Sequence, residues 1–461
     1  MSQGVICAVN VAPEYGHRMG FADEHGKVIK PSLQGGIAAM CYLGALFGAF
    51  WAGSFSDAYE RIKGIWLACA WRLVGAILQT SAVNLAHMLC ARVVAGVGVS
   101  FIIVIAPSWT AELTPAAHRG QMIALTFLAN FGGIALSSWI GFATSFTDDA
   151  GGAFRWRFCF ACQVFPIIFL VIGTLLIPKS PRWLVKVGCN QEAFEIITKL
   201  GEDGLLDHPN VQNYIKMLLG IGSGDIHIGR RIHLVFWLQV LMQYDMGIAA
   251  VVIYSGNIYR TAGFDDFKSN WLPANHFVLT VAPADFSSGG LNRGAVNNPD
   301  KTEQYGTGAA AMVFLYVVVF SSSWLMIPFI YPTEILPTRL RAKGNAFGVA
   351  VWAVGYGAGS LLVPVMIAGI HEKVNVTRLR CRHVHLHPHN LLFLRFFPET
   401  AGRSLEQIDF LFASKSPFVW DEEKVFTKRM TQFNAEIQKM EIENGGYGGG
   451  EKTCEKFVEK V

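Results

Sequence analysis

A short motif that occurs twice constrains the fold of this chain more than any other feature. The first copy reads Pro-Ser-Trp-Thr-Ala-Glu-Leu-Thr-Pro around Glu112, and the second reads Pro-Phe-Ile-Tyr-Pro-Thr-Glu-Ile-Leu-Pro around Glu334. Each glutamate follows an aromatic residue by three positions and precedes a proline by three and an arginine by seven. The matched residues are Trp109 and Tyr331, Pro115 and Pro337, and Arg119 and Arg341. The copies lie 222 residues apart in a chain of 461, and apolar runs flank both, so we predict two related halves.

The composition indicates that these halves lie in a membrane. Only 16% of the residues are charged and 52% are hydrophobic, whereas soluble domains average about 25% charged residues. The charges cluster and leave apolar windows of about 20 residues, long enough to cross a hydrocarbon core. We therefore predict an all-α membrane protein. The sequence holds no Walker loop, nucleophile elbow or HExxH motif, so we expect neither an enzyme nor a bound cofactor.

Eight apolar runs are candidate membrane spans. They cover approximately residues 34–55, 64–83, 92–112, 120–145, 158–177, 232–254, 308–331 and 346–370. The loops that contain Arg61, Arg119 and Arg341 are richer in Lys and Arg than the alternate loops, which places them in the cytoplasm. Eight spans in this orientation put both ends of the chain outside.

The chain divides into five parts on the same criteria. They are an N-terminal segment (1–33), a first helical half (34–178), a cytoplasmic linker (179–231), a second helical half (232–412) and a polar tail (413–461).

Four further segments carry recognisable patterns. They read Gly53-Ser-Phe-Ser-Asp57-Ala-Tyr-Glu-Arg61-Ile, Arg92-x-x-x-Gly-x-Gly, Pro178-Lys-Ser-Pro-Arg-Trp-Leu and Pro398-Glu-Thr-Ala-Gly-Arg-Ser-Leu-Glu. Together with the repeated motif, they make the chain resemble the sugar porter family of the major facilitator superfamily, in its fungal form. The resemblance implies a helix bundle of two pseudo-symmetric halves, with eight recognisable spans of an expected twelve. It also implies transport by alternating access, either coupled to protons or facilitative.

Departures from the family pattern raise an alternative. The first helix is expected to be absent, and with it the acid usual for proton coupling. Residues 265–309 replace the expected eighth and ninth helices, and the twelfth is reduced to residues 391–397. A truncated or non-transporting relic, or a membrane protein that resembles a nutrient sensor, is therefore the competing hypothesis.

The resemblance also implies a set of gating ion pairs. The residues at matching positions are Asp57, Arg61, Arg92, Glu112, Arg119, Glu334 and Arg341. We expect each glutamate to bind an arginine from another helix, with Arg61 and Arg92 as the candidates for Glu112. Such pairs would hold the cytoplasmic side shut. The alternative is that the arginines only fix the topology.

The implied substrate site is poor in amide side chains. Its candidate residues are Gln243, Gly247, Phe127, Ala249, Phe329 and Trp352. Ala249 and Phe127 stand where the family usually has Asn and Gln, and Phe329 stands for a tryptophan. Fewer amides bind sugar hydroxyls less well, which favours a flatter or less hydroxylated substrate. Gln243 is equally well explained as a packing contact between helices.

Other motifs carry less weight. Histidines alternate from His383 to His389, but Pro388 and the lack of a surrounding fold argue against a zinc site, so we expect no metal. Cys159 and Cys162 share a helix face and are explained by packing. Asn375 begins a glycosylation sequon. The expected partners are a small sugar-like substrate and the lipid bilayer, with no nucleic acid, in a protein integral to the plasma membrane.

Overall fold

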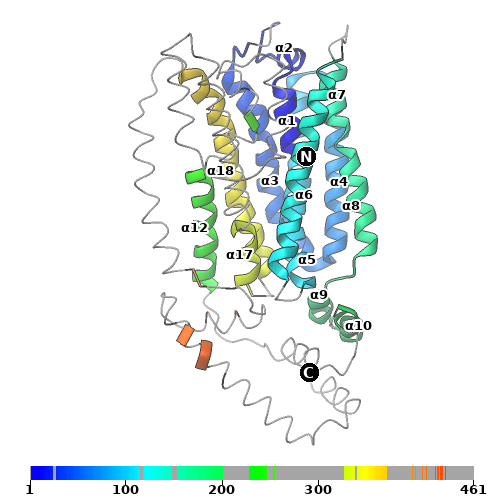
Figure 1. Ribbon diagram of the computed structural model, residues 1–461, viewed down its shortest axis with the longest axis vertical. Coiled ribbons are helices and arrows are strands. Elements are labelled where there is room, and N and C mark those ends of the chain that lie inside the picture. The colour runs from blue at the N-terminus through cyan, green and yellow to red at the C-terminus, as the bar shows by residue number, and fades with distance from the viewer. Residues whose placement is uncertain are drawn as a thin grey trace, which may run out of the picture.

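The computed structural model describes helices throughout, in two groups that pack side by side (Figure 1). The residues it describes are 2–23, 27–114, 118–147, 153–200, 228–246, 253–254, 257, 327–337, 340–370, 397–398, 400, 408, 412, 421, 423–424, 426–428 and 431. Six helices within these residues are long and apolar enough to cross a membrane. They correspond to six of the eight predicted spans; of the other two, residues 247–252 of the span 232–254 and residues 308–326 of the span 308–331 lie outside the described part.

The first group holds most of the described helices. In chain order they are α1 (Ser2–Asn10), α2 (Pro13–Met19), α3 (Pro31–Tyr59), α4 (Arg61–Thr80), α5 (Leu85–Leu113), α6 (Arg119–Thr144), α7 (Phe154–Ala161) and α8 (Val164–Leu176). The short helices α9 (Pro181–Val187) and α10 (Asn190–Leu200) lie below the bundle in Figure 1. The second group contains α12 (Ile228–Met246), α17 (Ile327–Ile335) and α18 (Arg341–Ile370).

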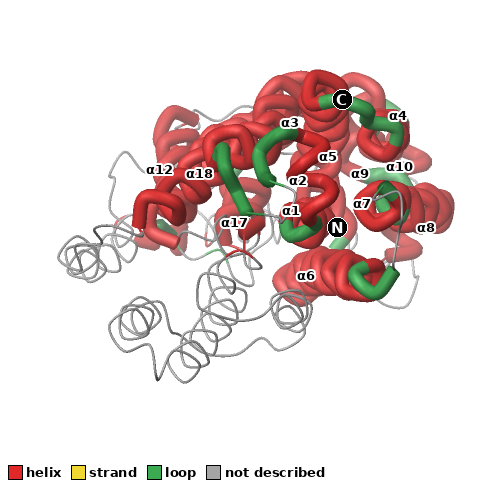
Figure 2. Tube along the Cα trace, turned by 90° about the horizontal axis from the view of Figure 1, so that it is seen from above, coloured by secondary structure: helices red, strands yellow, loops and turns green. Residues whose placement is uncertain are grey.

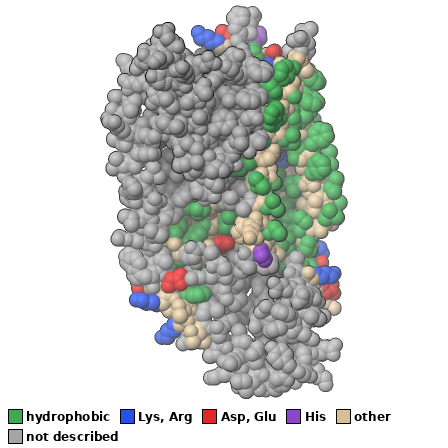
Figure 3. All heavy atoms as spheres, in the orientation of Figure 1, with side chains coloured by type: hydrophobic (Ala, Val, Ile, Leu, Met, Phe, Trp, Pro, Cys, Tyr) green, Lys and Arg blue, Asp and Glu red, His purple; other side chains and the backbone are tan. Residues whose placement is uncertain are grey.

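The outer face of the first group is apolar. Figure 3 shows hydrophobic side chains along the side where α6 and α8 lie, with charged side chains gathered toward the two ends. On α8, Phe169 and Leu176 are 72% and 82% exposed. Because exposed aromatic and aliphatic side chains of this kind would be costly in water, this face is suited to lipid.

A short helix near the N-terminus was not among the predicted elements. Helix α1 lies against α6 and α7, with Val5, Ile6 and Val9 almost fully buried. That a first membrane-spanning helix is absent stays a prediction. Nine residues of helix rise only about 14 Å, too little to cross a bilayer. Hydropathy analysis missed α1 because it is short, although it contributes to the main hydrophobic core.

The long helices α3 and α18 form the seam between the two groups (Figure 2). Small residues allow close approach at both ends of this seam. A Cβ atom on Gly35 would come within 2.6 Å of the Leu361 carbonyl oxygen, and one on Gly53 within 2.8 Å of Ala346 Cβ. The helices therefore run antiparallel and touch along most of their length.

The positions of Pro398 and Thr400 differ from those that the predicted topology gives them. Thr400 donates a hydrogen bond to Glu334, and Tyr331 donates one to the carbonyl of Pro398. Glu334 lies at the end of the bundle where α18 begins, whereas Ile370 ends α18 some 45 Å of helix away. Pro398 and Thr400 therefore lie at the end of the bundle where α18 begins, and not at the end where α18 finishes, where eight spans would place them. Asn375 falls outside the described residues.

Paired glycines in α3 provide a test of the seam. Gly35→Leu places a side chain against the backbone of Ser360 and Leu361 and forces the helices apart, whereas the adjacent Gly36 has nothing within 4 Å. Overpacking costs about 1–3 kcal/mol. We expect a membrane-impermeant maleimide to label Ser360→Cys more readily when Gly35→Leu is also present. Gly36→Leu is the matched control. Equal labelling in all three backgrounds would show that the seam is not closed at this end.

Candidate functional site

A buried carboxylate at the end of α5 is the centre of the candidate site. Glu112 is only 3% exposed. Its two oxygens accept hydrogen bonds from Arg61, at 3.3 Å from Nε and 3.1 Å from Nη2. The Ser180 hydroxyl also donates to Glu112, at 2.5 Å. Two parallel bonds from one guanidinium fix the geometry as well as the charge of the pair.

Arg61 owes its position to a very tight junction. Helix α3 ends at Tyr59 and α4 begins at Arg61, so Glu60 alone connects them. The remaining amino group of the guanidinium, Nη1, donates to the Ser56 carbonyl at 2.7 Å and lies 3.4 Å from the Asp57 carboxylate. Arg61 therefore joins the end of α3, the start of α4 and the end of α5.

The second half contributes a cation to the same carboxylate. Arg341, the first residue of α18, places Nη1 3.7 Å from Glu112 Oε1, and both side chains are fully buried. One turn later, Asn345 Nδ2 donates to the Val104 carbonyl at 2.7 Å and lies 3.3 Å from the Ser108 hydroxyl. These contacts hold together the ends of the two halves that we predicted to be cytoplasmic. We expected each glutamate to bind an arginine from another helix, and Arg341, which was not a candidate named for Glu112, forms its ion pair with the first copy of the motif.

The second copy of the motif repeats one part of this arrangement. The Thr400 hydroxyl donates to Glu334 at 2.6 Å, as the Ser180 hydroxyl does to Glu112. Ser180 and Thr400 are 220 residues apart, close to the 222 between the glutamates. Nearby, Arg231 Nη1 donates to the Ile335 carbonyl at 2.6 Å.

The sequence analysis did not identify the hydroxyl groups of Ser180 and Thr400 or the side-chain amide of Asn345 as parts of the site. Ser180 and Thr400 occupy the third position of the segments that begin at Pro178 and Pro398, which we noted only as family patterns. The two segments are separated by almost the same number of residues as the two glutamates. Comparing these separations would have suggested that each hydroxyl belongs with the glutamate of its own half. Asn345 has no counterpart of this kind, and only the packing of α18 against α5 reveals it.

Arg92 does not belong to this cluster, contrary to our expectation. It lies on the same helix as Glu112 but 20 residues earlier, about 30 Å along the axis. Its guanidinium donates to the Ile37 carbonyl and to the Gln79 side chain. Arg92 therefore cannot bind Glu112. The side chain of Arg119 lies outside the described residues.

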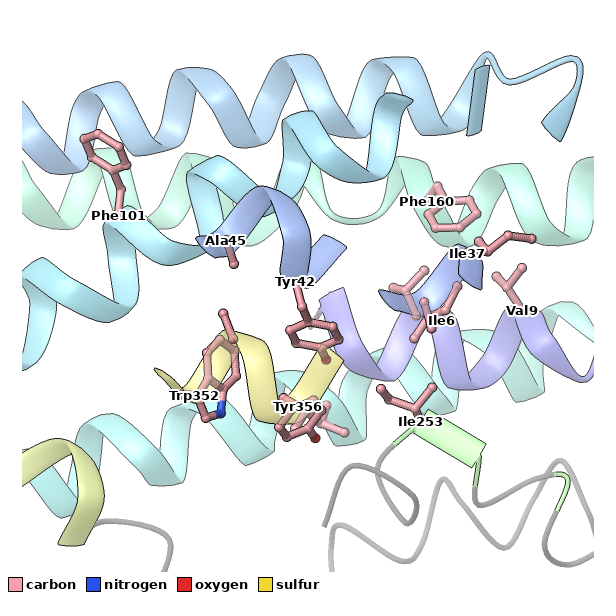
Figure 4. Close-up of a cluster of buried hydrophobic side chains, with 14 of the residues drawn as sticks. Ile6, Val9, Ile37, Tyr42, Ala45, Phe101, Phe160, Ile253, Trp352 and Tyr356 are labelled. Carbon is pink, nitrogen blue, oxygen red and sulfur yellow. The ribbon is translucent and has the colours of Figure 1, made fainter. Parts of the chain in front are cut away.

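Two of the predicted substrate residues belong to an aromatic cluster between the halves. Trp352 and Phe329 have ring centroids 6.2 Å apart. Trp352 also contacts Tyr42 of α3 and Tyr356 of α18, at 5.5 and 5.4 Å. Figure 4 shows Tyr42, Trp352 and Tyr356 side by side. The side chains of Phe127 and Gln243, and residues Gly247 and Ala249, lie outside the described part of the chain.

Known proteins share both this sequence pattern and this fold. A family model described as "Sugar (and other) transporter" matches residues 2–282 and 290–412. The chain belongs to the sugar transporter family. Family membership and the helical architecture together establish a major facilitator bundle that is integral to a membrane.

The matches to individual proteins extend over most of this chain and most of the matched protein. The chain is 26% identical over 422 residues to the MFS-type transporter criB of Aspergillus cristatus, covering 83% of this chain and 85% of the relative. It is also 26% identical over 437 residues to a high-affinity glucose transporter of Kluyveromyces lactis, covering 83% and 78%. The solved proton:xylose symporter XylE superposes with a TM-score of 0.69 at 20% identity, covering 89% of this chain and 97% of XylE.

These matches bear on the segments that we expected to be missing. The family model includes most of residues 265–309, which we had interpreted as a replacement for two helices. Those residues, and the histidine tract at 383–389, lie outside the described part of the structure. Within the described residues, no group of His, Cys, Asp and Glu is arranged to hold a metal ion.

Glu60 is held in a strained conformation beside the cluster. Its φ of 89° and ψ of 152° lie in a region that is almost restricted to glycine. Burial raises the pKa of the Glu60 carboxyl, against opposing effects of Lys179 and Lys63. The folded protein therefore binds this proton more tightly than the unfolded chain, and this contribution to stability is lost as pH rises through the folded pKa.

Substitution of Glu60 separates the backbone effect from the charge effect. Both Glu60→Gly and Glu60→Ala remove the buried carboxyl, but only glycine relieves the positive φ. We expect Glu60→Gly to be more stable than Glu60→Ala by about 1–3 kcal/mol, measured by thermal unfolding of the purified transporter. Equal stability of the two variants would show that the junction is not strained.

Removing the charge of Glu112 tests the cluster itself. Glu112→Gln keeps the shape but weakens the bonds to Arg61 and Arg341, by about 1–3 kcal/mol for a charged hydrogen bond. We expect the cytoplasmic ends to part more often, by about 5- to 150-fold. A thiol reagent applied from the cytoplasmic side should then label Ser108→Cys faster. Lys179→Gln, which removes an exposed ion pair with Glu192, is the control. An unchanged rate of labelling would show that the cluster does not hold this end closed, and would favour the alternative that its arginines only fix the topology.

Proposed function

We propose that this protein carries a sugar, or a related polyol or acid, across the plasma membrane by alternating access. The observation that supports this most directly is the ion pair between Glu112 of one half and Arg341 of the other. It joins the two halves of a sugar transporter family member at one end of the bundle. A contact of this kind is what must break when the cytoplasmic side opens.

The contacts of Glu112 differ in strength in the way that a gate requires. Charges that are removed from water are costly unless their partners are well placed. Around Glu112, Arg61 and Ser180 belong to the same half and stay in place, whereas Arg341 belongs to the other half. When the halves separate, Glu112 keeps its bidentate partner and Arg341 gains access to water. Opening therefore breaks the longer pair and preserves the shorter one.

The aromatic cluster supports a substrate position near the middle of the seam. Trp352 and Tyr42 come from opposite halves, and the Tyr42 hydroxyl accepts a hydrogen bond from Gln3 at 3.4 Å. Aromatic faces stack on the apolar faces of sugar rings, while hydroxyl and amide groups bind their oxygens. The glucose transporter and xylose symporter among the similar proteins favour a monosaccharide or a compound of similar size.

Uptake measurements in cells that lack their own sugar transporters test the proposal. We expect saturable uptake of at least one radiolabelled hexose, pentose or polyol, and loss of this uptake in Trp352→Ala. Sensitivity to a protonophore would indicate proton coupling, and insensitivity would indicate facilitated diffusion. A protein that reaches the plasma membrane but takes up none of these compounds contradicts the proposal and favours the non-transporting alternative.

A further inference from the structure

A second buried arginine lies within the first half, away from the gate. Arg72 of α4 is 6% exposed, and its Nη2 donates to the Gln163 side-chain oxygen at 3.0 Å. Its other amino group, Nη1, is buried and makes no hydrogen bond within the described residues. The amide nitrogen of Gln163, a fully buried residue, also lacks an acceptor there. One hydrogen-bonded pair therefore presents two unused donors, one of them charged.

The surroundings of Arg72 do not neutralise its charge. A guanidinium stays protonated in proteins, and an uncompensated charge within a membrane protein is costly. The titratable side chains whose charges act on Arg72 are Arg92, Cys41 and Cys69. Arg92 adds a second positive charge, and the thiols are neutral in their ordinary form. No carboxylate pairs with Arg72 among the described residues.

Gln163 lies at an irregular turn within the neighbouring membrane span. Helix α7 ends at Ala161 and α8 starts at Val164. The backbone N–H groups of Cys162, Gln163 and Phe165 already donate to carbonyls at this turn. The unused donors are therefore the side-chain groups of Arg72 and Gln163.

We infer that Arg72 and Gln163 bind a small monovalent inorganic anion, of the size of chloride, inside the first half. Close packing against α5 holds the stem of the Arg72 side chain in place. A Cβ atom on Gly98 of α5 would lie only 2.7 Å from Arg72 Cγ and 2.8 Å from the Ala68 carbonyl oxygen. The anion supplies the acceptor that both donors lack and neutralises the guanidinium. It stabilises the half as a unit and is not the transported substrate.

Thermal unfolding of the purified full-length protein tests this site without any measurement of transport. The chloride in the buffer is replaced by gluconate at constant ionic strength. We expect the melting temperature to rise saturably with chloride, and to rise with bromide as well. In Arg72→Leu this dependence is lost. Lys63→Gln removes an exposed cation from the same helix, α4, and should leave the dependence unchanged.

A second variant keeps the test decisive if Arg72→Leu fails to fold. Gln163→Glu places a carboxylate beside Arg72 and should make the melting temperature independent of chloride. A wild-type protein that melts at the same temperature in gluconate and chloride overturns the inference. So does a chloride effect that persists in Gln163→Glu and Arg72→Leu. If wild type is insensitive to chloride but Cys69→Ser or Cys41→Ser lowers stability, a thiolate is the counter-ion and the anion site is refuted.

Discussion

The carboxylate of Glu112 occupies a place where three helices of one half meet the first residue of a helix from the other. Burial makes this charge costly, so the surrounding groups have to be arranged around it. Arg61 and Ser180 provide short hydrogen bonds, and Arg341 provides a longer ion pair across the seam. The tight junction at Glu60 brings Arg61 to Glu112, and the packing of α3 against α18 brings Arg341 to the same carboxylate.

The internal repeat explains why the arrangement is only partly symmetric. Each half gives its glutamate a hydroxyl partner from a segment that begins with proline, Ser180 in one case and Thr400 in the other. The arginine of the second copy, however, reaches the first glutamate. A pair of symmetric contacts would hold each half together without joining them. Because Arg341 of the second half pairs with Glu112 of the first, the motif links the two halves to each other.

Much of this fold followed from the sequence, because long apolar runs and repeated motifs are strong signals. The runs predicted six spans that the structure contains, and Arg61, which binds Glu112, was one of the two candidate partners named for it. The failures have physical causes. Helix α1 is too short for a hydropathy window, and Arg92 lies 20 residues before Glu112 on the same helix. The pairing of Arg341 depends on how the halves pack, which spacing within one segment does not encode.

A cross-link between the halves tests the central claim most directly. Asn345 Nδ2 and the Ser108 hydroxyl are 3.3 Å apart, so the two side chains meet across the seam, and cysteines at both positions are our choice for an oxidative cross-link. We predict that oxidation of the double variant Ser108→Cys and Asn345→Cys stops substrate uptake, and that a reductant restores it. Each single variant should be insensitive to the oxidant. Undiminished uptake by the fully cross-linked protein would contradict the account, because the two halves would not need to part at this end.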